Sequence, residues 1–160
     1  MGKNIIYSFL CLAFAIVIGG GVYEHLAVVP RWAIGPPASL AMFQGPYGLK
    51  AETFWMLIHP ITLLLYVIVL IISWKSARRK PVLIAFGGYV LVLVITTVYF
   101  VPELIAITTT NYSSQIDPSL TERAGMWEIL SLVRLGFLIL LSMVLFLGMA
   151  KEAPRKIRTT

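Results

Sequence analysis

Four long apolar runs, each long enough to cross a membrane as a helix, dominate the chain. They cover residues 4–29, 52–74, 81–107 and 125–150. The hydrocarbon core of a bilayer is about 30 Å thick, so a spanning helix needs roughly 20 mostly apolar residues, and each run meets this length. The pattern predicts an all-α, polytopic membrane protein, a four-transmembrane-helix bundle that forms a single transmembrane domain over residues 1–160.

Prolines and a polar cap mark several ends of these runs. Pro30 ends the first run, and Pro81 opens the third, where a missing backbone N–H costs little. Asp117 followed by Pro118 is typical of a helix N-cap, so we expect the fourth helix to begin ahead of its apolar run. The first run also resembles a secretory signal, but it continues past a typical signal core, and we interpret it as a retained first helix.

Two longer segments, residues 30–51 and 108–122, connect the runs on one side of the membrane. The first is rich in proline and glycine, which excludes a long regular helix. Residues 38–44 can still form a short turn of helix, and we expect Met42 and Phe43 to dip into lipid from it. The second segment is polar.

Composition supports the membrane assignment and excludes other classes. The chain is 59% hydrophobic and 12% charged, whereas an ordinary soluble domain carries about 25% charged residues. The long apolar runs exclude a disordered protein and a nucleic-acid-binding tail, so we expect no nucleic-acid partner. Cys11 is the single cysteine, which excludes an internal disulfide and a cysteine metal cage.

The net charge of +6 is concentrated on one side of the four-span arrangement. Nine of the 13 lysines and arginines fall there: Lys3, Lys75, Arg78, Arg79, Lys80, Lys151, Arg155, Lys156 and Arg158. Because basic residues mark the cytoplasmic side of membrane proteins, we expect a multi-pass protein of the cell membrane with both termini in the cytoplasm. Residues 30–51 and 108–122 are then the outer loops.

A few ionisable residues lie inside the spans, where each charge costs about 2.5–3.5 kcal/mol at a helix centre. They are Glu24, His25, His59, Glu103, Glu128 and Arg134. At a rise of about 1.5 Å per residue, all fall within roughly 15 Å of the outer boundary. All four helices therefore contribute to one layer of polar groups in the outer half of the bundle.

Helical spacing predicts that these groups face one another. Three stripes recur at intervals of three, four or seven residues: Trp55, His59, Thr62 and Tyr66; Tyr89, Thr96, Tyr99 and Glu103; Trp127, Ser131 and Arg134, with Glu128 on the flank of the last. Gly20 and Gly21 lie one turn below Glu24 and permit close helix approach there. Such stripes are expected to face the bundle interior rather than lipid.

Three interpretations of this layer remain open. In the first, it only holds the bundle together, with Arg134 neutralising one or two of Glu24, Glu103 and Glu128. The protein would then be a structural subunit of a membrane complex or an oligomer.

In the second, the layer is a pocket for a small hydrophobic or quinone-like molecule, with oxidoreductase-type chemistry. His59 and Glu103 would handle protons, Glu24 or Glu128 would assist, and Arg134 would hold a carboxylate or an anionic ligand group. Aromatic side chains would form the walls: Trp55, Tyr66, Tyr89, Tyr99 and Trp127.

In the third, the layer binds a metal ion or haem. The candidate ligands are His25, His59, Glu24, Glu103 and Glu128, with the two histidines as the candidate haem ligands. The Glu-x-x-His spacing usual for carboxylate-bridged bundles is absent.

The residues at these levels form a recognisable combination of short motifs. They are Gly19-Gly20-Gly21 before Glu24 and Pro30, Phe54-Trp55 with His59-Pro60, Thr96 to Tyr99-Phe100-Val101-Pro102, and Trp127 with Arg134. In this respect the chain resembles the anthrone-oxygenase-like family of small four-helix membrane proteins. The resemblance implies the same architecture and, from the fungal members, oxidation of polycyclic phenolic substrates without an obvious cofactor motif. Glu103 stands where members often carry an uncharged polar residue.

Overall fold

The computed structural model describes residues 2–151, and four helices in that part of the chain are long and apolar enough to span a membrane. The first is α1 (Gly2–Tyr23), η1 (Glu24–Val28) and α2 (Val29–Trp32); the second is α3 (Glu52–Ser73); the third is α4 (Arg79–Ile95), η3 (Thr96–Phe100) and α5 (Val101–Thr108); the fourth is α6 (Pro118–Met149). These helices confirm the predicted all-α, four-helix membrane fold.

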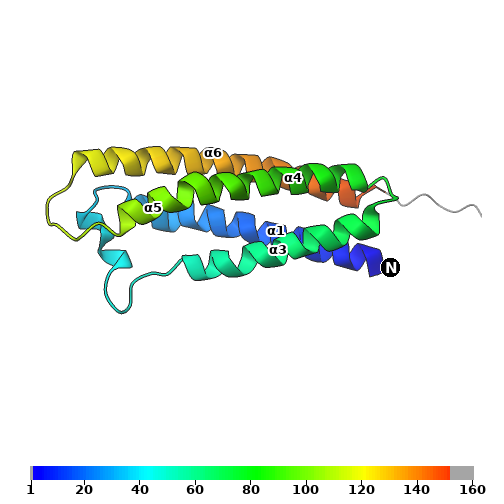
Figure 1. The fold of residues 1–160 in the computed structure, drawn as a ribbon, viewed down its shortest axis with the longest axis horizontal. Coiled ribbons are helices and arrows are strands. Elements are labelled where there is room, and N and C mark those ends of the chain that lie inside the picture. The colour runs from blue at the N-terminus through cyan, green and yellow to red at the C-terminus, as the bar shows by residue number, and fades with distance from the viewer. Residues whose placement is uncertain (1, 152–160) are drawn as a thin grey trace, which may run out of the picture.

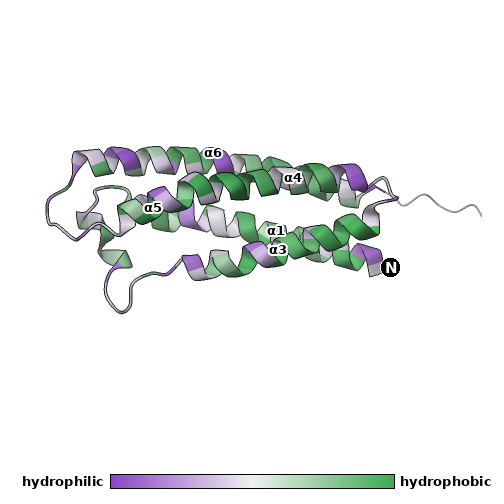
Figure 2. Cartoon of the chain, in the orientation of Figure 1, coloured by the Kyte–Doolittle hydropathy of each residue, from purple (hydrophilic) through white to green (hydrophobic). Residues whose placement is uncertain are grey.

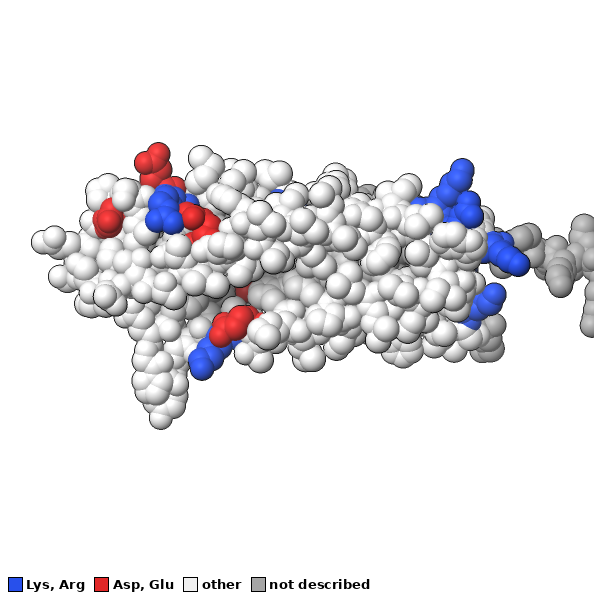
Figure 3. All heavy atoms as spheres, in the orientation of Figure 1, with Lys and Arg blue, Asp and Glu red and all other residues white. Residues whose placement is uncertain are grey.

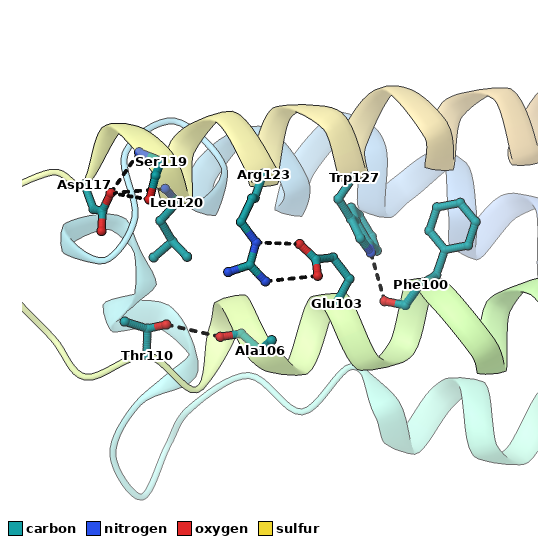
Figure 4. Close-up of polar contacts among 9 residues, drawn as sticks. All are labelled: Phe100, Glu103, Ala106, Thr110, Asp117, Ser119, Leu120, Arg123 and Trp127. Carbon is teal, nitrogen blue, oxygen red and sulfur yellow. Dashed lines mark hydrogen bonds and ion pairs between the residues drawn. The ribbon is translucent and has the colours of Figure 1, made fainter.

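The helix ends agree with the sequence patterns at three of the four spans. Pro30 is the exception, because the first helix continues through it to Trp32. Asp117 caps α6 as expected: its carboxylate accepts hydrogen bonds from the backbone N–H groups of Ser119, at 2.8 Å, and Leu120, at 3.2 Å (Figure 4). Hydrogen bonds from Ser119 and from the Leu120 backbone hold the pKa of the Asp117 carboxyl below its usual value.

The helices pack as an elongated bundle in which neighbours run in opposite directions (Figure 1). α1 packs against α3 and α6, and α4 packs against the same two helices. The first and third spans therefore lie diagonally across the bundle from each other. The outer surface of the bundle is largely apolar, as a lipid environment requires (Figure 2).

The two ends of the bundle differ in charge. The start of α1, the turn between α3 and α4 and the end of α6 lie together at one end, called here the basic end because Lys3, Lys75, Arg78–Lys80 and Lys151 belong to it (Figures 1 and 3). The other end, called the loop end, carries the connections 33–51 and 109–117. The predicted cytoplasmic residues Arg155, Lys156 and Arg158 lie outside the described residues.

Two apolar clusters fill the bundle. The basic-half cluster contains Tyr7, Phe14, Tyr66 and Tyr89, all fully buried. The loop-end cluster is built around Trp32, Phe100 and Trp127, whose rings pack edge-to-face.

The short 3-10 helix η2 (Ala38–Phe43) confirms the predicted helical turn in the first long loop. The lipid contact expected for Met42 and Phe43 stays a prediction. Both side chains are only partly exposed and pack against the loop-end cluster, and the Phe43 ring lies 6.2 Å from that of Trp32. Packing against the loop-end cluster covers part of the apolar surface of both side chains.

Candidate functional site

A layer of polar side chains separates the two apolar clusters. It consists of Glu24, His25, Trp55, His59, Thr96, Ser131 and Arg134, and is called the polar layer below. Each of the four spans contributes at least one of these residues. Four helices thus converge on one layer, in which Trp55 and His59 lie together on one helix and Ser131 and Arg134 on another, as their spacing predicts.

Both diagonal helices open into a π-helical turn at the level of this layer. In η1 the backbone N–H of Val29 donates to the carbonyl of Glu24, and in η3 that of Val101 donates to the carbonyl of Thr96. A proline follows each turn, at position 30 and at position 102. A proline inside a helix lacks a donor and clashes with the carbonyl four residues earlier, which accounts for the widening of each preceding turn.

The turn η3 changes which residues of the third span face inward. Each π-helical turn takes up one extra residue, so the regular period of 3.6 no longer holds beyond it. Phe100, 5% exposed, faces the interior, whereas Tyr99 is 37% exposed on the outside. The single stripe predicted for Tyr89, Thr96, Tyr99 and Glu103 is therefore wrong beyond Thr96.

Trp55 links the carboxylate and one histidine of the polar layer. Its indole N–H donates to Glu24 Oε1 at 2.8 Å, and its ring stacks on the His59 imidazole with 5.2 Å between ring centres. His59 Nδ1 is in turn hydrogen-bonded to the Tyr89 hydroxyl at 2.6 Å. Glu24, Trp55, His59 and Tyr89 thus form one continuous chain across three spans.

Arg134 organises the other side of the layer. Its guanidinium donates to Thr96 Oγ1 at 3.0 Å and to Ser131 Oγ at 2.8 Å, and it lies 4.1 Å from the centre of the Phe100 ring. His25 Nε2 is hydrogen-bonded to the same Ser131 hydroxyl at 3.0 Å. The polar layer therefore contains a cation held by hydroxyl groups and an aromatic face.

Glu24 and Arg134 attract each other electrostatically but form no direct ion pair. Only Oε1 of Glu24 and only Nδ1 of His59 are hydrogen-bonded within the described residues. Glu24 Oε2 and His59 Nε2 thus have no partner in that part of the chain. His25 Nδ1 is buried, also without one. Buried polar groups in folded proteins are almost always satisfied, so His25 Nδ1 calls for an explanation, whereas Glu24 and His59 are only partly buried and their free atoms can meet a ligand or water.

Glu103 lies outside this layer. Its two carboxylate oxygens accept from Arg123 Nε at 2.8 Å and Nη2 at 3.0 Å, closer to the loop end (Figure 4). The structure does not bring Glu103 to His59, with which the sequence analysis paired it. Among residues 2–151 this is the single ion pair, so the neutralisation of a glutamate by Arg134 is not direct.

The remaining predicted site residues are not part of the polar layer. The Trp127 indole N–H donates to the Phe100 carbonyl at 2.9 Å within the loop-end cluster (Figure 4). Tyr66 is buried among aromatic rings of the basic-half cluster, and its hydroxyl has no partner in the described chain. Glu128 is half-buried, with no hydrogen bond within residues 2–151.

The predicted metal ligands are not assembled. Among the described residues, no three histidine, cysteine or acidic side chains lie close enough together to hold a metal ion. His25 and His59 also have different partners, Ser131 and Tyr89. The five-residue ligand set expected from the sequence is therefore wrong as a cluster.

Sequence reasoning missed the two π-helical turns. The signal for them is the Val-Pro pair at 29–30 and at 101–102, each inside an apolar run that continues beyond it. Comparisons of the chain with protein-family models, with curated proteins and with solved structures found no match in any of the three. The assignment of a function therefore rests on the geometry of the polar layer.

Proposed function

We propose that this integral membrane protein binds a small, ring-bearing hydrophobic molecule of the phenol or quinol type between Glu24 and His59. The observation that carries the proposal is the position of Trp55. It contacts both side chains, and one polar atom of each, Glu24 Oε2 and His59 Nε2, has no partner among residues 2–151. These two atoms are the binding points for a ligand hydroxyl.

The chemistry of the surrounding groups fits a ligand that exchanges protons. A carboxylate oxygen accepts a hydrogen bond from a phenolic hydroxyl, and an imidazole nitrogen can take up or return a proton. The Tyr89 hydroxyl fixes the orientation of the His59 ring through Nδ1. The Trp55 ring offers an aromatic edge for a ligand ring. The cation of Arg134 balances the charge of Glu24 across the layer.

Access from the lipid side supports a hydrophobic ligand. Figure 3 shows a recess between α3 and the α4–α5 side of the bundle, with acidic atoms visible inside it. A shallow, almost wholly apolar groove of about 340 Å³ runs beside α3 and α4, lined by Leu63, Val90, Leu93, Val94, Thr97 and Val98. Leu63 lies one helical turn from His59, so the groove lies on the lipid side beside the polar layer, although none of its lining residues belongs to that layer.

The resemblance to the anthrone-oxygenase-like family favours polycyclic phenols as ligands and their oxidation as the reaction to assay. We further infer that the basic end faces the cytoplasm, which places the polar layer in the outer half of the cell membrane. An impermeant maleimide applied to intact cells should label Ser114→Cys at the loop end and spare Ala77→Cys at the basic end. Labelling of Ala77→Cys but not of Ser114→Cys would show the opposite orientation.

Binding of naphthol, a fluorescent phenol, to the protein in lipid nanodiscs tests the proposed site. Naphthalene, which lacks the hydroxyl, and empty nanodiscs measure partition into lipid. A hydrogen bond to a charged group contributes about 1.5–3 kcal/mol, so Glu24→Gln should raise the Kd for naphthol at least about tenfold. His59→Gln should act in the same direction.

The matched control is Glu103→Gln, the same substitution on a carboxylate bonded to Arg123. It should leave the naphthol Kd unchanged. Equal effects of Glu24→Gln and Glu103→Gln would refute the site. Loss of thermal stability by Glu24→Gln together with unchanged naphthol binding would instead favour a structural role for the layer.

A further inference from the structure

The basic end contains a second hollow, far from the polar layer. It has a volume of about 490 Å³ and is lined by residues 74–77 of the turn between α3 and α4, by Arg79 and Lys80 at the start of α4, and by Lys151. Four of its lining residues are cations: Lys75, Arg79, Lys80 and Lys151. No acidic side chain of the described residues lines it. The volume falls within the roughly 300–1,000 Å³ typical of small-ligand sites.

Arg78 brings the two parts of this hollow together. Its guanidinium donates to the carbonyl oxygens of Lys151, at 2.9 Å, and Met149, at 3.0 Å, and to Asn4 Oδ1 at 2.7 Å. These bonds tie the end of α6 to the α3–α4 turn. The fourth cation, Lys151, therefore comes from a distant part of the chain and is held beside the other three.

The location of the hollow suits a lipid headgroup. The apolar helices α3 and α6 end here and α4 begins, so the hollow lies at the boundary between hydrocarbon and water. Trp74, half-exposed, lies at its rim with the Arg79 guanidinium 5.3 Å from its ring. Tryptophan favours this boundary, and cations beside it meet the headgroup phosphates.

We propose that this hollow, the four-cation site, binds the phosphate of an anionic phospholipid, with the acyl chains along the exposed apolar faces of α3 and α4. Ile71 and Ile84 are exposed on these faces, 68% and 57% respectively. Four positive charges without a neighbouring described carboxylate favour a ligand with net negative charge over a zwitterionic one. The proposal is independent of the naphthol site.

Native mass spectrometry of the detergent-solubilised protein, titrated with phosphatidylglycerol or with phosphatidylcholine of identical chains, tests the site. The first lipid should bind at least about tenfold more tightly. One basic residue near an anionic surface contributes roughly a fivefold gain in affinity, so Lys75→Gln with Lys80→Gln should weaken phosphatidylglycerol binding about thirtyfold. The charge-preserving variant Lys75→Arg with Lys80→Arg should bind phosphatidylglycerol as tightly as the wild-type protein.

Two controls decide between specific and general attraction. Arg31→Gln with Lys50→Gln removes two cations from the loop end and should leave phosphatidylglycerol binding unchanged. Equal losses in both double variants, or equal binding of the two lipids, would overturn the site. Displacement of the lipid by inorganic phosphate at equal concentration would show a site for a free anion and overturn the assignment to lipid.

Discussion

Replacement of Arg134 by methionine perturbs the polar layer at its only cation. Methionine keeps much of the apolar volume of the arginine stem and removes the guanidinium. Two hydrogen bonds are lost, to Thr96 and to Ser131, together with the contact to the Phe100 ring. The two hydroxyl groups keep other partners, the Val92 carbonyl and His25, so neither is left without a hydrogen bond.

The expected loss of stability in Arg134→Met follows from these contacts. Each charge-assisted hydrogen bond contributes about 1.5–3 kcal/mol, and a desolvated cation–π contact contributes about 2 kcal/mol. The cost of holding a charge within the membrane offsets a large part of this sum. We expect Arg134→Met to lower the free energy of unfolding by about 2–4 kcal/mol.

The electrostatic attraction between Arg134 and Glu24 gives a sharper form of the prediction. In the Arg134→Met variant Glu24 has lost the nearby cation, so Glu24→Gln should lower the free energy of unfolding by less than it does in the wild-type protein. We expect a coupling free energy of about 1–3 kcal/mol in this double-mutant cycle. Glu128→Gln, on the same helix as Arg134 and without a recorded partner in the described chain, is the control and should be additive.

Cys11 supplies the assay. It is the only cysteine, and it is buried between α1 and its neighbours. A fluorogenic maleimide reacts with it only on unfolding, so its reaction reports unfolding during titration with sodium dodecyl sulfate. A change below about 0.5 kcal/mol for Arg134→Met, or additivity with Glu24→Gln, would refute the stabilising role of the guanidinium.

Three further predictions concern the scaffold. Gly148→Ala should destabilise the bundle by about 1–3 kcal/mol in the Cys11 assay, because the added Cβ comes within 3 Å of the Tyr7 and Pro81 side chains. Gly87→Ala is the control and should not destabilise the bundle, because the space around its added Cβ is open. Trp127→Phe should cost about 1 kcal/mol in the same assay through its lost hydrogen bond to a backbone carbonyl, and no cost would contradict that bond. The pKa of Asp117 is lower in the folded protein than in the unfolded chain, so its carboxylate stabilises the fold at pH values above the unfolded-state pKa and loses this effect as the pH falls through the folded-state pKa. Asp117→Ala should therefore remove this contribution to the fall of the unfolding temperature at acid pH. An unchanged pH profile of the unfolding temperature would contradict the cap.

The membrane fold could be predicted because its physical causes are local in sequence. Each apolar run is long enough to span the bilayer, and Asp117-Pro118 starts a helix through contacts within three residues. The convergence of Glu24, His59 and Arg134 followed from their equal depths in the spans.

The facing of residues beyond a π-helical turn could not be predicted from a constant helical period. Phe100 takes the inward position that the regular spacing assigned to Tyr99. Glu103 is shifted in the same way and pairs with Arg123 instead of reaching His59. The extra residue arises from backbone geometry ahead of Pro102, and hydrophobic periodicity carries no record of it.

The partners of individual polar atoms also required the structure. One interpretation of the sequence had Arg134 neutralise a carboxylate directly, but hydroxyl groups and an aromatic ring hold its guanidinium. Trp55 was expected to form a wall, and its hydrogen bond to Glu24 depends on the contact between α1 and α3. Such pairings are set by tertiary packing, which fixes distances that spacing along one helix leaves open.

Infrared difference spectroscopy on addition of naphthol tests the central claim most directly, because it observes the carboxyl group itself. The account predicts a ligand-induced change in a carboxyl band that is present in the wild-type protein and in Glu103→Gln and absent in Glu24→Gln. No carboxyl change on naphthol binding, or a change that persists in Glu24→Gln, would contradict a ligand site at Glu24 and His59.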